Sequence, residues 1–274
     1  MSKPANQSLE DLSRTLRYNI LKMIYEAQSG HPGGSFSAID LMTVLFRDVL
    51  KYRPENPEWP DRDRFILSKG HAAPALYAVL AHFGFFPEDQ LKTLRKMGSP
   101  LQGHPEKNKL PGVEASTGSL GQGISIGIGM ALAARLDKKD YRTYVMVGDG
   151  EINEGQVWEA ALYAGTHHLD HLIVILDHNG FQLDGSTGEI LSLDPLAEKW
   201  KAFGWNVIEI NGHRMDEISR AFGQAVKNSG KPTLILAKTI KGKGVTFMEN
   251  NNEFHGMAPN KEQYATAVKE LGYA

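Results

Sequence analysis

The sequence predicts an α/β fold, a doubly wound parallel sheet with helices on both faces. Short aliphatic segments alternate along the chain with longer segments of helical periodicity, which is the pattern of repeated strand–helix units. The segment at 172–176 is apolar at every position, as expected of a parallel strand that is buried on both faces. Helical crossovers then make neighbouring strands parallel. We expect a single domain over residues 1–274, with a helical segment at 1–60 packed on it.

Two helices are expected before the first strand. Apolar side chains recur at helical spacing over 11–27, and the glycine- and proline-rich stretch 29–34 is expected to end that helix before a second one at 38–49. Later segments predict helices at 72–83, 122–136, 153–166, 194–203, 215–227 and 261–271. Aliphatic segments between them predict strands at 64–68, 141–147, 172–176, 205–210 and 232–239.

The composition is typical of a globular protein. Of 274 residues, 41% are hydrophobic and 23% are charged, and the length is sufficient for one large α/β domain. A formal net charge of -2 predicts neither nucleic acid nor an anionic membrane as a partner, and the longest apolar runs are too short to span a bilayer. The chain has no cysteine, which excludes disulfides and thiolate chemistry and fits a cytoplasmic location.

Polar and glycine-rich residues follow four of the predicted strands. They occupy positions 69–71, 148–150, 177–179 and 241–244. The carboxyl ends of parallel strands meet at one edge of a sheet, and ligands of such sheets bind outside that edge. We therefore expect these four segments to form one site.

Asp149 and Asn179 are the residues of this edge that predict a metal ion. Mg²⁺ prefers oxygen ligands and usually takes one or two from the protein, with the rest from water and phosphate. The glycines at 148 and 150 would let the backbone approach a phosphate, and the helix expected from 153 would add free N–H groups. Each residue alone is a common turn residue. The pair, about thirty positions apart on successive strand ends, favours a metal and diphosphate site.

The same residues carry a family resemblance. Gly148, Asp149 and Gly150, followed by Asn179, match the thiamine-diphosphate fingerprint of Gly-Asp-Gly, about thirty residues and Asn. Six further segments resemble transketolase motifs and occur in the transketolase order: 29–33, 68–71, 103–106, 117–123, 151–155 and 254–256. From about residue 10 to about residue 260 the chain therefore resembles the transketolase family. That resemblance implies the thiamine-diphosphate-binding fold, in its diphosphate-binding (PP) type.

The resemblance implies two cofactors, thiamine diphosphate and Mg²⁺, with Ca²⁺ or Mn²⁺ as alternatives to the magnesium. Asp149, Asn179 and the backbone carbonyl of Phe181 would hold the metal ion. Glu154, counted among the cofactor contacts, and Glu159 would lie at a subunit interface near the partner's catalytic glutamate. The other cofactor contacts would be His71, Gly150 and His255 on the diphosphate, Gly118 and Leu120 on the aminopyrimidine, and Leu183 on the thiazolium.

Four histidines in these motifs are expected to act on the substrate: His31, His71, His104 and His255. A ketose presents a carbonyl and several hydroxyls, and neutral imidazole donates from one nitrogen and accepts at the other. An imidazole pKa near neutrality also suits proton transfer to the alkoxide formed at the carbonyl. A lone loop histidine is more often structural, and we expect that of His82, His167, His168, His171 and His213.

The resemblance also implies a partner. A full transketolase continues for two more domains, one of which carries the glutamate that hydrogen-bonds the aminopyrimidine, and no segment here resembles it. Because the chain begins with Met1 and ends beyond a plausible last helix, we expect a separate N-terminal subunit rather than a fragment. Its partner would be a C-terminal transketolase subunit with the pyrimidine-binding domain. The expected assembly is a heterotetramer of two of each, with the active site between the two kinds of subunit.

The expected activity is that of a transketolase of the pentose phosphate pathway. A two-carbon ketol unit would pass from a ketose (phosphate) to an aldose (phosphate) through a thiamine-diphosphate carbanion. An alternative keeps the cofactor in a 2-oxo acid decarboxylase or dehydrogenase, or in a transketolase-like C–C ligase, although the histidine set favours a polyol substrate. A non-enzymatic binding module is a third interpretation. A nicotinamide site is not favoured because the glycines at 118–123 follow a loop rather than a strand.

Overall fold

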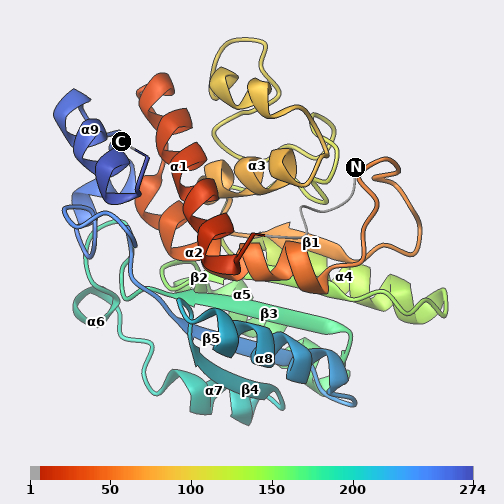
Figure 1. Cartoon of the computed structure of the whole chain (residues 1–274). Coiled ribbons are helices and arrows are strands. Elements are labelled where there is room, and N and C mark those ends of the chain that lie inside the picture. Colours follow the sequence, from red (N-terminus) through yellow and green to blue (C-terminus); the bar gives the residue numbers. More distant parts are fainter. Residues whose placement is uncertain (1–6, 274) are drawn as a thin grey trace.

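Five parallel strands form the sheet in the part of the chain that the computed structural model describes, residues 7–273. The spatial order β1-β2-β3-β5-β4 puts β3 at the centre, as Figure 1 shows. All four pairings are parallel, which confirms the doubly wound parallel sheet predicted from the alternation of strand and helix. The strands are β1 (Arg64–Leu67), β2 (Thr143–Gly148), β3 (Leu172–His178), β4 (Asn206–Asn211) and β5 (Thr233–Lys238).

Helices cover both faces of the sheet because alternate strand side chains point to opposite sides. Tyr144 and Met146 of β2 belong to the core on one face, whereas Val145 and Val147 belong to the core on the other. Burial of these apolar side chains holds the helices to the sheet. The first core is completed by α1 (Leu9–Ala27), α2 (Pro32–Val44), α3 (Ala73–His82) and α8 (Met215–Lys227), and the second by α4 (Gln122–Leu136), α5 (Gly155–Thr166) and α7 (Leu196–Ala202).

The N-terminal helices belong to the first of these cores. Helix α1 packs against α2 and α3, and α9 (Lys261–Glu270) lies beside α1 (Figure 1). The domain bounds expected from the sequence, 1–60 and 1–274, include residues 1–6 and 274, which lie outside the described residues. The division into domains therefore stays a prediction.

The first helix ends at Ala27 as predicted, but the break before the second helix is shorter than predicted, because only residues 28–31 separate α1 from α2. Helix α2 begins at Pro32, includes the two following glycines and continues into a π-helical turn, Leu45–Val49. Proline is tolerated in a first helical turn because the N–H it lacks would have no helical partner there. A Cβ at Gly33 would lie 2.9 Å from the carbonyl oxygen of Phe254. The glycine therefore allows close packing of the helix against a distant loop.

Several other boundaries also differ from the prediction. The helix expected from residue 153 is α5, which begins two residues later, at Gly155. A 3-10 turn, Glu151–Asn153, precedes it. Segments this short do not show a helical period in the sequence. The unpredicted short elements are α6 (Thr187–Ile190) and the 3-10 turns Gly70–Ala72, Glu88–Thr93 and Asn252–His255.

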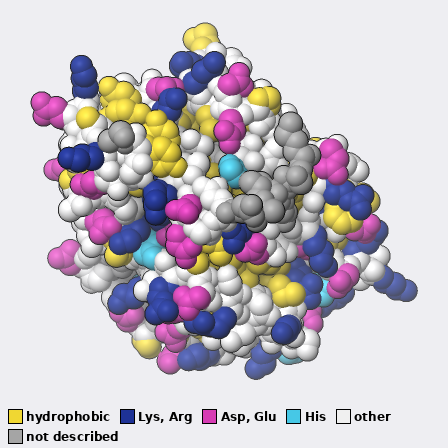
Figure 2. Space-filling model, viewed as in Figure 1, with side chains coloured by type: hydrophobic (Ala, Val, Ile, Leu, Met, Phe, Trp, Pro, Cys, Tyr) yellow, Lys and Arg dark blue, Asp and Glu magenta, His cyan; other side chains and the backbone are white. Residues whose placement is uncertain are grey.

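Charges of both signs are interspersed on the face of the molecule that Figure 2 shows. The near-balance of 30 basic and 32 acidic residues in the sequence accounts for this mixture. Within residues 7–273, none of the helices has the length and apolar character needed to cross a membrane.

Gly165 and Gly129 offer a matched test of the helix packing, because both lie in helices, α5 and α4. A Cβ at Gly165 would lie 1.8 Å from the backbone carbonyl oxygen of Phe203, whereas a Cβ at Gly129 would meet nothing within 4 Å. We expect Gly165→Ala to lower the free energy of unfolding in urea by about 2 kcal/mol or more. Gly129→Ala should leave it unchanged or raise it by up to about 1 kcal/mol. Equal stability of the two variants would contradict the packing described.

Candidate active site at the carboxyl edge of the sheet

Four strands end together at the edge that the sequence predicted. Gly148 of β2 pairs in register with Asp177 of β3, and Asp177 pairs with Ala237 of β5. Beyond β1, the N–H of Ser68 donates to the carbonyl of Met146 in β2 at 2.8 Å. The segments that follow these four strands are therefore brought to one place.

A cavity of about 380 Å³ lies at this edge, a volume within the range of small-molecule sites. Lys69 and Lys241 line it, together with the apolar side chains of Ile190 and Leu191. Glu159, which was expected at the interface with a partner subunit, is exposed on α5 and is not part of the cavity wall. The predicted cofactor and metal residues on the wall are His71, Leu120, Asp149, Gly150, Glu154, Asn179, Phe181, Leu183 and His255.

Asp149 is buried directly after β2, and its carboxylate holds the loop that follows β3. It accepts a hydrogen bond from the N–H of Asn179 at 3.1 Å and another from the N–H of Gly180, and it lies 3.2 Å from Nδ1 of His178. The amide oxygen of Asn179 accepts from the N–H of Phe181 at 3.1 Å. Burial raises the pKa of Asp149, and the neighbouring carboxylate raises the pKa of His178. The structure thus brings the three predicted metal ligands onto adjoining loops.

A buried ion pair adjoins the cavity. Asp177 is fully buried, and Lys69 bonds to it through Nζ while donating to the carbonyl oxygen of Gly34 at 2.9 Å. The hydroxyl of Ser37 donates to one carboxylate oxygen at 2.5 Å, and the hydroxyl of Thr239 donates to the other. Burial opposes the charged form, but Lys69 beside it holds the pKa of Asp177 below its ordinary value. One carboxylate therefore joins α2 to the ends of three strands.

Glu151 connects two loops of the cavity wall with the end of β1. Its buried carboxylate accepts hydrogen bonds from the N–H groups of Gly121 and Gly148, at 2.9 and 3.2 Å, and from the hydroxyl of Ser68. Burial raises the pKa of Glu151, and these hydrogen bonds act against that increase. Gly148 lies on the wall at the end of β2, and Gly121 directly follows Leu120 of the wall, so Glu151 fixes these two segments relative to each other.

Three of the four predicted histidines form a cluster. Their ring centroids are 5.3 Å apart between His31 and His71, 5.5 Å between His31 and His255, and 5.2 Å between His71 and His255. His104 lies on the exposed rim and packs on Gly118, where a Cβ would be 2.9 Å from its Cδ2. Gly118 also has a φ of 147°, a conformation that favours glycine. These two residues lie beside the cavity rather than on its wall.

Burial and neighbouring cations keep the clustered imidazoles neutral. Burial, followed by Arg95, lowers the pKa of His31 to about 4. Burial, followed by Lys241, lowers the pKa of His255 to about 4, and burial lowers the pKa of His71 well below its ordinary value. Nζ of Lys241 lies 2.9 Å from Nδ1 of His255, and burial lowers the pKa of Lys241 to about 8. At neutral pH each ring can therefore both donate and accept a hydrogen bond.

Sequence reasoning gave no role to several charged residues of this site. Asp177 offered a signal, because a carboxylate at the end of an aliphatic strand must find a partner when it is buried. Lys69 and Glu151 lie inside motifs that the resemblance used. Arg95 offered none, because it lies in a loop, where it donates to Ser29 Oγ at 2.9 Å and approaches the His31 ring.

A family model described as "Transketolase, thiamine diphosphate binding domain" matches residues 8–274. The chain belongs to the transketolase family. This confirms the family that the spaced motifs predicted, and it makes thiamine diphosphate the cofactor of the matched domain.

Two bacterial transketolase subunits match this chain nearly end to end. The chain is 46% identical to the 6-deoxy-6-sulfo-D-fructose transketolase subunit of Clostridium sp. (strain MSTE9), over 96% of each chain. It is 43% identical to an apulose-4-phosphate transketolase subunit of Phocaeicola vulgatus, over 97% of this chain and 94% of that one. Human transketolase is 41% identical over 97% of this chain, which spans only 42% of the human protein.

Solved transketolases share the fold. The crystal structure of transketolase from Campylobacter jejuni superposes with a TM-score of 0.91 at 37% identity, covering 97% of this chain and 43% of that chain. Transketolase from Leishmania mexicana gives the same TM-score at 35% identity, covering 97% and 41%. Over 97% of its length, this chain therefore has the fold of solved transketolases.

The neutral histidine cluster predicts how stability depends on pH. The folded-state pKa of His31 and of His255 lies near 4, below the ordinary value of 6.5, so the unfolded chain takes up protons first as the pH falls. The free energy of unfolding should therefore decrease as the pH falls from 6.5 to 4. His31→Gln should make that decrease shallower in urea titrations, whereas the exposed His167→Gln should leave it unchanged. The same slope in wild type and His31→Gln would contradict the cluster's neutrality.

Proposed function

We propose that this chain is the diphosphate- and metal-binding subunit of a transketolase, which transfers a two-carbon ketol unit from a ketose to an aldose. One observation carries the proposal. In a chain of the transketolase family, the cavity at the sheet edge is lined by Asp149 and Asn179 as well as by neutral imidazoles. A diphosphate with a divalent ion needs oxygen ligands such as those of Asp149 and Asn179, and a sugar with several hydroxyls needs groups that both donate and accept hydrogen bonds, such as the neutral imidazoles.

The residues at the edge fit thiamine diphosphate with Mg²⁺. Asp149 offers carboxylate oxygens, Asn179 an amide oxygen and Phe181 a backbone carbonyl, and such hard donors suit Mg²⁺. Within residues 7–273, no three His, Cys, Asp or Glu side chains are grouped to hold a metal by themselves. The ion would therefore depend on the amide and carbonyl oxygens and on the diphosphate. Ca²⁺ or Mn²⁺ would be compatible with the same donors.

The clustered histidines would act on the sugar and on the diphosphate. When bound, thiamine diphosphate supplies the carbanion chemistry that breaks and forms the carbon–carbon bonds. A neutral imidazole with a pKa near 4, as at His31, is a weak base, so it binds hydroxyls by donating and accepting hydrogen bonds. An anionic diphosphate beside Lys241 and His255 would raise the imidazole pKa values toward neutrality. His104, on the rim, would contact the substrate as it enters.

A partner subunit is part of the proposal, because the cavity is bordered by exposed apolar side chains. Leu183, Ile190 and Leu191 line the cavity and are 64%, 49% and 56% exposed. Exposed apolar groups at the border of a site mark an interaction surface. Related proteins of similar length are named as transketolase subunits. We infer a C-terminal transketolase subunit with the pyrimidine-binding domain as partner, in a heterotetramer of two of each, with Glu154 and Glu159 at the interface.

The proposed substrates are a ketose and an aldose that carry an anionic group. The two bacterial relatives are named for a sulfo sugar and for a sugar phosphate. A role in the pentose phosphate pathway and a cytoplasmic location belong to the same proposal. A 2-oxo acid needs no array of neutral imidazoles, so the cluster favours a polyol over the decarboxylase and dehydrogenase alternatives.

Asp149→Asn should weaken magnesium-dependent binding of thiamine diphosphate by about 100-fold or more, because the change removes the one carboxylate among the proposed ligands. Isothermal titration of the purified chain with thiamine diphosphate, with and without MgCl₂, measures this. Asp137→Asn, at the exposed end of α4, is the matched control and should leave the affinity unchanged. Equal affinities of wild type and Asp149→Asn would contradict the assignment of the metal site.

The chain alone should show no ketol transfer, because the aminopyrimidine would have no glutamate partner. Adding the C-terminal subunit should restore transfer from a ketose phosphate to an aldose phosphate, measured by chromatography of the sugar products. Pyruvate in place of the ketose should yield no carbon dioxide. Full activity without a partner would contradict the two-subunit proposal, and pyruvate decarboxylation would favour the alternative enzyme class.

A further inference from the structure

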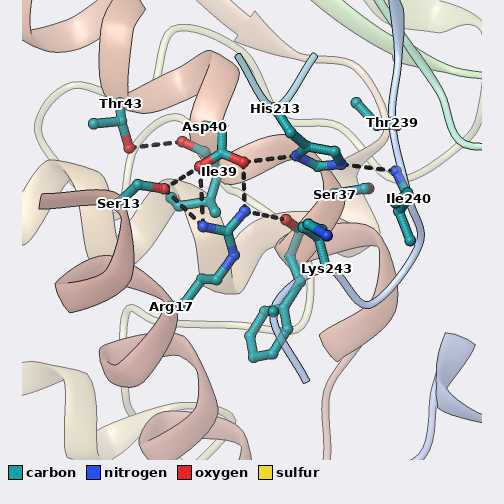
Figure 3. A network of polar contacts seen from close by, with 12 residues as sticks. Ser13, Arg17, Ser37, Ile39, Asp40, Thr43, His213, Thr239, Ile240 and Lys243 are labelled. Carbon is teal, nitrogen blue, oxygen red and sulfur yellow. Dashed lines mark hydrogen bonds and ion pairs between the residues drawn. The ribbon is translucent and has the colours of Figure 1, made fainter. Parts of the chain in front are cut away.

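A buried polar network lies outside the cavity and connects α1 and α2 to the loop after β5 (Figure 3). Asp40 of α2 is its centre. Its carboxylate accepts from the guanidinium of Arg17 at 2.9 and 2.5 Å and from the hydroxyl of Ser13. On the opposite side it lies 2.7 Å from Nδ1 of His213, and Nε2 of that ring accepts from the N–H of Ile240 at 2.8 Å.

These contacts have a fixed polarity. A backbone N–H can only donate, so Nε2 of His213 must be the acceptor for Ile240 and must carry no proton. The proton of the neutral ring is then on Nδ1, where it is donated to the carboxylate of Asp40. The hydrogen bonds therefore form a chain in which Ile240 donates to the imidazole, the imidazole donates to Asp40, and Arg17 donates to the same carboxylate. The sequence alone left His213 as one of five structural histidines, because nothing in the pattern linked it to residues so distant in the chain.

Charged side chains of both signs surround the imidazole of His213. Arg17, Lys243 and Glu249 are its charged neighbours together with Asp40 and Glu217. Burial acts against the charged form of Asp40, but Arg17 and the hydrogen bond from His213 hold the pKa of Asp40 well below its ordinary value. The carboxylate therefore stays an acceptor, and the charge of Arg17 balances it.

The loop after β5, to which His213 is hydrogen-bonded, contains Lys241, a basic residue that lines the cofactor cavity. Ile240 directly precedes Lys241, whose ammonium lies 2.6 Å from Asn252 Oδ1 and 2.9 Å from His255 Nδ1. Lys241 and His255 both line the cavity. The N–H of Ile240 donates to the ring of His213, which lies in the turn before α8. This hydrogen bond fixes the backbone between the end of β5 and Lys241.

We propose that His213 is a positioning residue for the diphosphate end of the cofactor site: it anchors Ile240 to Asp40 through a neutral imidazole and so directs Lys241 and His255 into the cavity. This inference rests on the proposed function, because it assigns a consequence for binding of thiamine diphosphate. It gives the network of Figure 3 a role in ligand affinity in addition to any role in stability.

The unliganded wild-type chain provides the first measurement. Nitrogen-15 NMR of the histidine rings at neutral pH should show His213 with a protonated Nδ1 and an unprotonated Nε2. Hydrogen–deuterium exchange should show the Ile240 amide protected. A protonated Nε2 would overturn the proposal, and so would an Ile240 amide that exchanges as a free loop amide. Neither measurement depends on the cofactor.

Two variants then separate positioning from stability. His213→Phe keeps the ring shape without either nitrogen, and His213→Gln keeps one donor and one acceptor. We expect His213→Phe to lose protection of the Ile240 amide and to weaken magnesium-dependent thiamine diphosphate binding about tenfold, the usual scale for one hydrogen bond left unmade. His213→Gln should recover most of both. His167→Phe, on an exposed turn after α5, is the control for replacing a histidine by phenylalanine.

The outcomes distinguish this inference from the proposed function. If wild type binds no thiamine diphosphate with Mg²⁺, the proposed function fails and the positioning role with it. If wild type binds and folded His213→Phe binds equally well, only the positioning role is overturned. If His213→Phe does not fold, His213→Gln decides: wild-type affinity together with a protected Ile240 amide supports the proposal, and lost protection with unchanged affinity overturns it.

Discussion

The carboxylate of Asp177, near the end of the central strand, is the interaction on which the site's geometry depends. It binds Lys69 from the segment after β1, Ser37 from α2 and Thr239 from the segment after β5. A buried charge is costly unless it is paired and its remaining lone pairs are satisfied. That requirement forces these segments to meet at one point, and the strand-end loops of the cavity are arranged around it.

The site combines charged groups with neutral ones. Lys69 lies on the cavity wall and is paired with the buried Asp177, and the imidazoles of the cluster stay neutral because burial and nearby cations disfavour their charged form. Lys241 adds a cation at the wall itself. A polyol and an anionic cofactor tail make these two kinds of demand, hydrogen bonding from neutral groups and stabilisation of negative charge, and the proposed transketolase chemistry needs both in one cavity.

Much of the fold was predictable because it rests on periodicity. The strands and long helices follow from aliphatic runs and amphipathic spacing, and α4 and α8 have the predicted bounds. The site edge was predictable because parallel strands end together, and the family was predictable from short motifs. The rest depended on packing between distant segments. The backbone of Phe254 approaches Gly33 of α2 too closely for a side chain, and His213 gains its partners from α2 and from the loop after β5. No local pattern contains such contacts.

The proposed function requires the edge loops that carry Asp149 and Asn179 to hold a divalent ion together with a diphosphate. A crystal structure of the chain with thiamine diphosphate and Mn²⁺ in place of Mg²⁺, with anomalous data collected at the manganese edge, tests it most directly. We expect one anomalous peak between the Asp149 carboxylate and the Asn179 amide oxygen, with diphosphate oxygens completing the ligand shell. Bound cofactor whose manganese peak lies away from both side chains would contradict it.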